Sequence, residues 1–275
     1  DRLVAAEHHL VKALAHSERS GRDASHIRGL IALVMKRQGR IVEAAARMLE
    51  VVEDLELREE VVLGAVWTVN LSSVLHQAGA FEESQHRARR AVSLARVAGR
   101  RPTEGIALCV LSELAIERGD VDAAEELVRE AEAVRERSDD PYLGCEVELS
   151  RGRVHVLRDR RAEGIASLEA GWARGPRVEA ETRAAIALWM ARAGSAERAL
   201  EMNDELERRA SDDEPYLLAQ CALVRGEAEL ARGRPQHARG ALLQGSAELG
   251  RLELPAHAPL LTAYEGLRER LAALR

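Results

Sequence analysis

Residues 105–134, GIALCVLSELAIERGDVDAAEELVREAEAV, predict a helical hairpin. Apolar residues recur every three or four positions on both sides of Arg118-Gly119-Asp120, which is the spacing of an amphipathic helix. Gly119 suits the left-handed backbone conformation that ends many helices, and Asp120 can accept hydrogen bonds from the free amides of the next helix. Because the turn between them is so short, we expect the two helices to lie antiparallel.

The same arrangement recurs along the chain at a nearly constant interval. Equivalent turns lie 40 and 80 residues before Gly119, and Asp159 holds the position 40 residues after it. Two further turns follow after 35 and 39 residues. A helix–turn–helix pattern that stays in phase over six units indicates a repeat architecture in which neighbouring units stack. The turn glycines are Gly39, Gly79, Gly119, Gly194 and Gly233.

Two columns of small residues support this register. One column lies five positions after each turn marker and the other seven positions before it, where closely crossing helices need short side chains. Alanine is abundant here, but abundance alone does not explain a small residue at every one of these positions. The first column is Ala44, Ser84, Ala124, Gly164, Ala199 and Ala238, and the second is Ala32, Ser72, Ser112, Gly152, Ala187 and Gly226.

Composition favours a helical protein that does not bind nucleic acid. Of the 275 residues 46% are apolar and only 3% aromatic, so Leu, Val, Ile and Ala must build the core. The prolines fall between predicted helices or at their starts; those between repeats are Pro102, Pro141, Pro176, Pro215 and Pro255. A net charge of −6 argues against a nucleic-acid partner. No apolar run is long enough for a membrane span, and three separated cysteines favour a reducing, cytoplasmic setting.

The pattern resembles the tetratricopeptide repeat, with its small residue, turn glycine, alanine and late proline. Asn70-Leu71-Ser72 is similar to the family's NLG segment, and Gly175-Pro176 falls at the expected proline. The resemblance covers residues 24–250 and implies an all-α fold, a right-handed α-solenoid of antiparallel helix hairpins. Most aromatic residues of the motif are missing, and the period exceeds the family's usual ~34 residues. The repeats are therefore divergent, with helices about one turn longer.

We predict three parts in the chain. Residues 1–23 are the second helix of a repeat whose first helix is absent, which suggests that the native protein continues upstream. Residues 251–275 hold a closing helix, over Ala256 to Ala273, and each hairpin between them buries its faces only against its neighbours. The six repeats are predicted at 24–58, 59–101, 102–140, 141–176, 177–213 and 214–250.

No constellation of residues supports catalysis, a metal site or a cofactor. The sequence has no phosphate-binding loop, dinucleotide fingerprint, GxSxG or HExxH motif. His8 and His9 are adjacent, so they cannot easily face one metal, and His76 and His86 lie on opposite sides of a turn. The arginines between Arg87 and Arg101 could contact phosphate or an acidic partner, but ion pairs with nearby acids such as Glu82 and Glu83 explain them better. We expect no enzyme activity.

In repeats of this type, the first helix of each hairpin lines a concave inner surface, which predicts a groove for a protein or peptide. Of the carboxylate clamp that chaperone-tail binders use, only Asn70 is present, so that partner is disfavoured; Asn70 can equally bridge neighbouring helices. The predicted groove residues are Val69, Asn70, Ser73, His76, Gln77, Ile106, Cys109, Val110, Glu113, Glu117, Leu149, Arg153, Leu188, Arg192, Leu223 and Glu227.

Two non-catalytic functions follow from the resemblance. The first is an interaction scaffold, which includes a stand-alone adaptor in a larger assembly. The second is the regulatory arm of a bacterial signalling protein. Leu223 to Arg234 resembles segments in the C-terminal arrays of large ATP-binding transcription regulators and of repeat-bearing Ser/Thr kinases. In those families the array binds an effector or partner and restrains an upstream ATPase or kinase domain.

The register predicts that Leu127 faces the interior of the third hairpin. Leu127→Asp should therefore unfold the middle of the array, at a cost of about 2–5 kcal/mol. Thermal unfolding followed by circular dichroism measures this, and an unchanged melting curve would contradict the placement.

Overall fold

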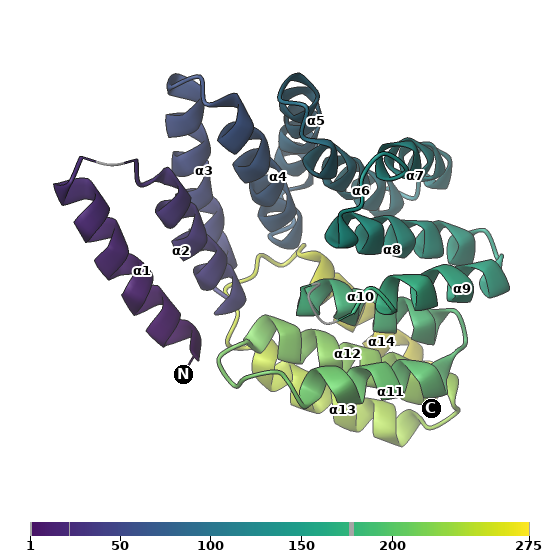
Figure 1. The fold of residues 1–275 in the computed structure, drawn as a ribbon. Coiled ribbons are helices and arrows are strands. Elements are labelled where there is room, and N and C mark those ends of the chain that lie inside the picture. The colour runs from purple at the N-terminus through teal and green to yellow at the C-terminus, as the bar shows by residue number, and fades with distance from the viewer. Residues whose placement is uncertain (1, 22, 176–178, 275) are drawn as a thin grey trace.

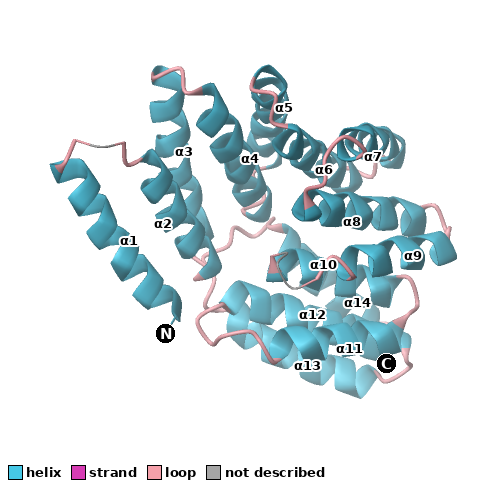
Figure 2. Cartoon of the chain, in the orientation of Figure 1, coloured by secondary structure: helices cyan, strands magenta, loops and turns pink. Residues whose placement is uncertain are grey.

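A computed structural model describes residues 2–21, 23–175 and 179–274, and within these ranges the chain consists of helices and connecting loops (Figure 2). The predicted all-α class is confirmed. In chain order the helices are α1 (Arg2–Arg19), α2 (Ser25–Arg37), α3 (Ile41–Leu57), α4 (Val61–Gln77), α5 (Phe81–Val97), α6 (Arg101–Glu117), α7 (Val121–Arg135), α8 (Pro141–Leu157), α9 (Arg161–Trp172), α10 (Ala180–Arg192), α11 (Ala196–Glu207), α12 (Pro215–Ala231), α13 (Pro235–Leu249) and α14 (Pro259–Ala272).

The helices form two curved layers (Figure 1). Even-numbered helices from α2 to α14 contact one another in sequence and form the inner layer, and odd-numbered helices pack outside them. Each even helix pairs with the odd helix that follows it, from α2–α3 to α12–α13. This is the predicted α-solenoid of helix hairpins. The six repeat limits stay a prediction, because adjoining hairpins also pack closely on each other.

The hairpin turns have the backbone that the sequence predicts. All five turn glycines have φ between +70° and +91°. Asp159, which replaces glycine in the fourth turn, keeps φ at +58°, and short polar residues tolerate this region better than branched ones do. The backbone amide of Ala123 donates to Asp120 Oδ1 at 3.0 Å, so the predicted helix cap is confirmed.

The two columns of small residues meet where the helices of a hairpin cross. Ser84 Oγ donates to the carbonyl oxygen of Ser72 at 2.8 Å, and Ser112 Oγ donates to that of Ala124 at 3.2 Å. At the fourth crossing, a Cβ added to Gly152 would lie 2.7 Å from Leu168 Cγ. Close backbone approach, rather than the abundance of alanine, therefore explains both columns.

Prolines mark helix starts, where a missing N–H costs nothing. Pro141, Pro215, Pro235 and Pro259 each begin a helix, and Pro102 lies in the first turn of α6. Pro176 lies outside the described residues. The closing helix α14 is shorter than predicted, because the chain from 250 to 258 forms a connection rather than a helical turn.

The expectation that each hairpin packs only against its neighbours is wrong at the two ends. Helix α12 contacts α2, and α14 contacts α4, so the array closes on itself. A single core cluster includes Met35 and Leu71 from the N-terminal hairpins together with Tyr216 and Leu223 from the C-terminal ones. The physical reason is that inner faces rich in Leu, Val and Met remain exposed in an open array, and closure removes them from water.

The connection between α13 and α14 also packs against the N-terminal hairpins. Leu252 lies against the α2–α3 turn, where a Cβ on Gly39 would be 2.4 Å from Leu252 Cδ2. His257 lies in the same way against the α4–α5 turn at Gly79, with its carbonyl oxygen 2.9 Å from the position of an added Cβ. Gly39 and Gly79 therefore have two roles. Each allows the chain to reverse in its turn, and each leaves room for the connection between α13 and α14 to pack against that turn.

Three arginines of α5, Arg87, Arg90 and Arg96, form ion pairs with nearby acids. Arg87 Nε lies 2.7 Å from Glu83 Oε1, as the sequence predicts. Arg96 Nε lies 2.7 Å from Glu104 Oε1 on α6 rather than reaching an acid on α5. Pairing across neighbouring helices stabilises the stack modestly, because exposed pairs contribute ~0–1 kcal/mol each.

Gly152→Val should destabilise the protein by about 2–4 kcal/mol, because its side chain would collide with Leu168 and separate α8 from α9. Chemical denaturation measures the change. Gly240→Ala on the exposed face of α13 is the control: nothing lies within 4 Å of its added Cβ, so it should stabilise by ~0.5–1 kcal/mol. Equal effects of the two variants would contradict the crossing geometry.

Candidate functional site

The inner layer lines a partly open cavity of about 210 Å³, which we call the central chamber. Every even-numbered helix contributes to its wall, so residues from 36 to 263 meet in one place. Its lining is Lys36, Ser73, His76, Gln77, Ile106, Cys109, Val110, Glu113, Ile116, Glu117, Tyr142, Glu146, Leu149, Ser150, Arg153, Glu179, Glu181, Thr182, Ala184, Ala185, Leu188, Trp189, Arg192, Tyr216, Gln220, Leu223, Pro259, Leu260 and Ala263.

Most predicted groove residues lie in this lining, and three lie elsewhere. Val69 is buried in the core between α4, α5 and α6. Asn70 Nδ2 donates to the carbonyl oxygen of Val66 within its own helix at 2.9 Å, so it makes a local bond rather than a bridge between helices. Glu227 is buried and pairs with Arg192 (3.5 Å) and with Arg270 on α14 (2.5 Å).

A partly buried ion pair crosses one wall of the chamber. Arg153 Nη1 on α8 lies 2.6 Å from Glu113 Oε1 on α6, and His76 Nδ1 on α4 lies 3.6 Å from Glu113 Oε2. Burial would raise the pKa of Glu113, but Arg153 and His76 outweigh burial and lower it. Glu113 is therefore an anion that three inner helices share.

An aromatic platform lies beside this pair. The guanidinium carbon of Arg153 is 6.0 Å from the ring centre of Trp189, and that of Arg192 is 5.2 Å away. Burial lowers the pKa of Arg192, against the opposing effect of Glu227. Both arginines are thus held by an acid and by the same indole ring.

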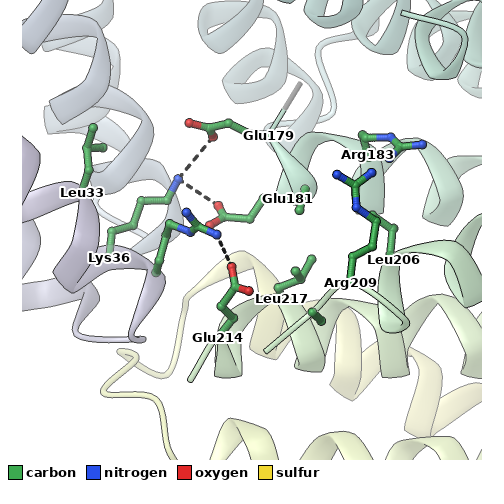
Figure 3. Close-up of a pocket in the computed structure, with 12 residues that line it drawn as sticks. Leu33, Lys36, Glu179, Glu181, Arg183, Leu206, Arg209, Glu214 and Leu217 are labelled. Carbon is green, nitrogen blue, oxygen red and sulfur yellow. Dashed lines mark hydrogen bonds and ion pairs between the residues drawn. The ribbon is translucent and has the colours of Figure 1, made fainter. Parts of the chain in front are cut away.

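Lys36 on α2 pairs with acids at the start of α10, across the edge of the chamber. Its Nζ lies 2.9 Å from Glu181 Oε2 and 3.8 Å from Glu179 Oε2 (Figure 3). Burial would lower the pKa of Lys36, but Glu181 and Glu179 together raise it above its ordinary value. Glu181 also accepts from Gln77 Nε2 at 2.9 Å. Lys36, Glu179 and Glu181 also line an adjoining pocket of about 290 Å³ (Figure 3). In this pocket Arg37 contacts Glu214.

Glu146 differs from the other charged residues in the chamber. The hydroxyl of Thr182 donates to its Oε1 at 2.7 Å, and among the described residues no cation lies within 4 Å of the carboxylate. Burial, helped by nearby Glu113 and Glu179, raises the pKa of Glu146 to about 7, against the opposing effects of the Thr182 hydrogen bond and Arg153.

Four residues in the lining have a buried polar atom without a partner in the described structure. Three of these atoms can accept a hydrogen bond: Gln77 Oε1, Gln220 Oε1 and, in one neutral tautomer, His76 Nε2. The fourth, Arg153 Nε, is a donor. Buried polar groups are nearly always satisfied in native proteins, so these atoms are candidates for hydrogen bonds to a ligand or to water.

Sequence reasoning missed Glu146, although the repeat register contained the signal. Glu146 stands 40 residues after Ile106 and therefore occupies the same inner-face position one repeat later. It also lies three and seven residues before Leu149 and Arg153, on the same side of α8. Glu179, Pro259 and Leu260 carried no such signal, because they lie in or next to connections between helices.

The described residues show no catalytic arrangement. Burial raises the pKa of all three cysteine thiols, to about 12 at Cys145 and Cys221, so none is an activated nucleophile. The described His, Cys, Asp and Glu residues form no group of three or more that could hold a metal. In the described part of the chain, no helix combines the length and the apolar character that crossing a membrane requires.

Comparison with known proteins identifies the architecture. The tetratricopeptide repeat family model matches residues 64–137, which hold most of α4 together with α5, α6 and α7. The resemblance to this repeat that the sequence predicts is therefore confirmed. A search of curated proteins found no match.

Solved structures share the fold at low sequence identity. A tetratricopeptide repeat protein from Parabacteroides merdae ATCC 43184 has a TM-score of 0.53 at 17% identity, covering 96% of this chain and 92% of that one. A Rap protein complexed with competence and sporulation factor has a TM-score of 0.60 at 12% identity, covering 91% and 76%. The apo form of RapI has a TM-score of 0.52 at 13% identity, covering 95% and 80%.

Glu146→Gln should change the pH dependence of stability. The folded-state pKa of Glu146, about 7, lies above the ordinary 4.5, so the wild-type protein loses stability as pH rises from about 4.5 through 7. Glutamine keeps an acceptor for Thr182 and removes this loss. We expect the variant to be more stable than the wild type by roughly 1–3 kcal/mol at pH 8 and nearly equal at pH 5.

Denaturant unfolding at the two pH values measures this difference. Glu53→Gln on the outer helix α3, where the side chain is exposed, is the control and should show no such change between pH 5 and pH 8. The same stability difference at both pH values for Glu146→Gln would show that the carboxyl group is not perturbed.

Proposed function

We propose that this protein is a non-catalytic interaction scaffold that binds a peptide, or a segment of a protein partner, in the central chamber. The observation that carries the proposal is the convergence of side chains from seven inner helices on one cavity with unpartnered polar atoms. A binding site uses convergent polar groups to orient a ligand, and the wall of the chamber offers such groups from several helices.

The comparisons support the same conclusion. Tetratricopeptide repeats are typically non-catalytic, and one of the similar structures is a Rap protein in complex with competence and sporulation factor. The inner layer of the present chain offers apolar contacts at Ile106, Val110 and Leu188 beside its charged groups, as a mixed peptide would require.

A narrower proposal is that the array is the regulatory arm of a larger bacterial signalling or transcription-regulatory protein. Its support is the resemblance at Leu223 to Arg234. Much of that segment is used by the fold: a Cβ on Gly226 would lie 2.7 Å from Leu267, Gly233 has φ +70°, and Arg225 pairs with Glu207 at 2.6 Å. Nucleotide-binding or kinase motifs encoded upstream of Asp1 would support this role. A stand-alone adaptor is the alternative if none is encoded there.

The test of binding must leave the core intact. Leu149 and Leu223 are obvious groove positions, but they are only 3% and 1% exposed, so a charge at either would unfold the protein. Ser73 and Ala185 are better choices, because both are partly exposed and line the chamber.

The double variant Ser73→Tyr with Ala185→Phe should fill the chamber and weaken peptide binding. The measurement is selection from a displayed random peptide library on the wild-type protein, followed by affinity measurements on the enriched peptides. We expect at least a tenfold loss of affinity, because the added rings occupy the cavity.

The matched control is Ser93→Tyr with Ala162→Phe on the outer helices α5 and α9. Ser93 Oγ donates to the carbonyl oxygen four residues earlier, as Ser73 Oγ does, so both serine changes remove the same bond. The control should bind as the wild type does. If the control lost binding and the chamber variant kept it, the peptide-binding site would lie on the convex face formed by the outer helices.

A further inference from the structure

The charges that line the central chamber do not balance. Its described acids are Glu113, Glu117, Glu146, Glu179 and Glu181, against the cations Lys36, Arg153 and Arg192. Each cation already has an acid within 4 Å: Lys36 with Glu181, Arg153 with Glu113, and Arg192 with Glu227. Glu146 and Glu117 have no ion-pair partner among the described residues, so the chamber has a surplus of negative charge.

Two of the four unpartnered atoms in the described lining are amide oxygens, which accept hydrogen bonds and match this surplus, whereas Arg153 Nε is a donor. Gln77 Nε2 donates a hydrogen bond to Glu181 Oε2, and the buried amide oxygen of Gln77 has no partner among the described residues. The amide oxygen of Gln220 is also free. His76 is only 7% exposed, and its Nε2 has no partner. In the neutral tautomer that carries its proton on Nδ1, Nε2 is a third acceptor, whereas in the protonated ring it is a donor.

An occupant that donates several hydrogen bonds and carries positive charge satisfies these groups. Lysine ammonium and arginine guanidinium are the side chains that donate three to five hydrogen bonds and accept none. An acidic side chain would instead meet Glu146 at close range and would find Arg153 and Arg192 already paired and stacked on Trp189.

The size of the chamber limits what enters it. At about 210 Å³ it is smaller than the ~300–1,000 Å³ of pockets that enclose a whole drug-sized ligand. One long side chain fits this volume, while the peptide that carries it extends along the inner layer, past exposed Glu117 at the end of α6.

We infer that the central chamber receives a lysine or arginine side chain of a peptide partner, and that Glu146 is the carboxylate that pairs with it. This inference rests on the proposed function and adds the chemistry of the partner. Thr182 holds Glu146 in position from α10 through its hydroxyl group, and Gln77 and Gln220 accept the remaining hydrogens of the cation.

A positional-scanning library of acetylated hexapeptides tests this on the purified chain at pH 8. For the wild type we expect at least tenfold enrichment of Lys and Arg over Asp and Glu at one peptide position. Glu146→Gln should remove that preference and weaken the best cationic peptide at least tenfold. Glu53→Gln, which removes an exposed acid from α3, should keep the wild-type preference and affinity.

The outcomes separate this inference from the proposed function. Binders with no cationic preference, or an undiminished preference in Glu146→Gln, would overturn the inference and leave the scaffold intact. The absence of any binder to the wild type would overturn both. Cadaverine carries ammonium groups on a carbon chain similar to that of a lysine side chain. If cadaverine alone bound as tightly as the best cationic peptide, the occupant would be a free diamine rather than a peptide, and the inference would be overturned.

Discussion

The contact between the two ends of the array decides the shape of this protein. Lys36 on α2 is buried, and its pairing with Glu181 on α10 brings together residues that are far apart in the chain. Beside it, apolar residues of α2 to α4 share one core with residues of α12 to α14. Breaking the closure would expose this apolar surface and leave a buried ammonium without its partners, which is costly for both reasons.

Closure also determines the character of the inner surface. In an open solenoid the first helices would present a long groove in contact with water. Here the same helices surround a small chamber in which charges are partly desolvated, so their interactions are stronger than at a free surface. The raised pKa of Glu146 and the lowered pKa of Glu113 are opposite results of one environment, because only Glu113 has a guanidinium beside it.

Local signals predicted the hairpins well because each signal acts within a few residues. A positive φ at Gly119, a cap at Asp120 and a small residue at Ser112 are short-range requirements of one turn and one crossing. The helical period and the repeat register are both read along the chain, and for the same reason most residues predicted on the inner face lie in the chamber lining. Glu146 belonged to that pattern and needed only the register to be applied consistently.

The sequence by itself determined the helices, their turns, their pairing into hairpins and the side of each helix that faces inward. Only the tertiary structure decided that α12 meets α2 and α14 meets α4, that Lys36 pairs with Glu181, and that Glu146 remains without a cation. The curvature of an array is the sum of small rotations at every crossing, and no single residue encodes that sum. Which side chains meet across the chamber therefore depends on all the hairpins at once.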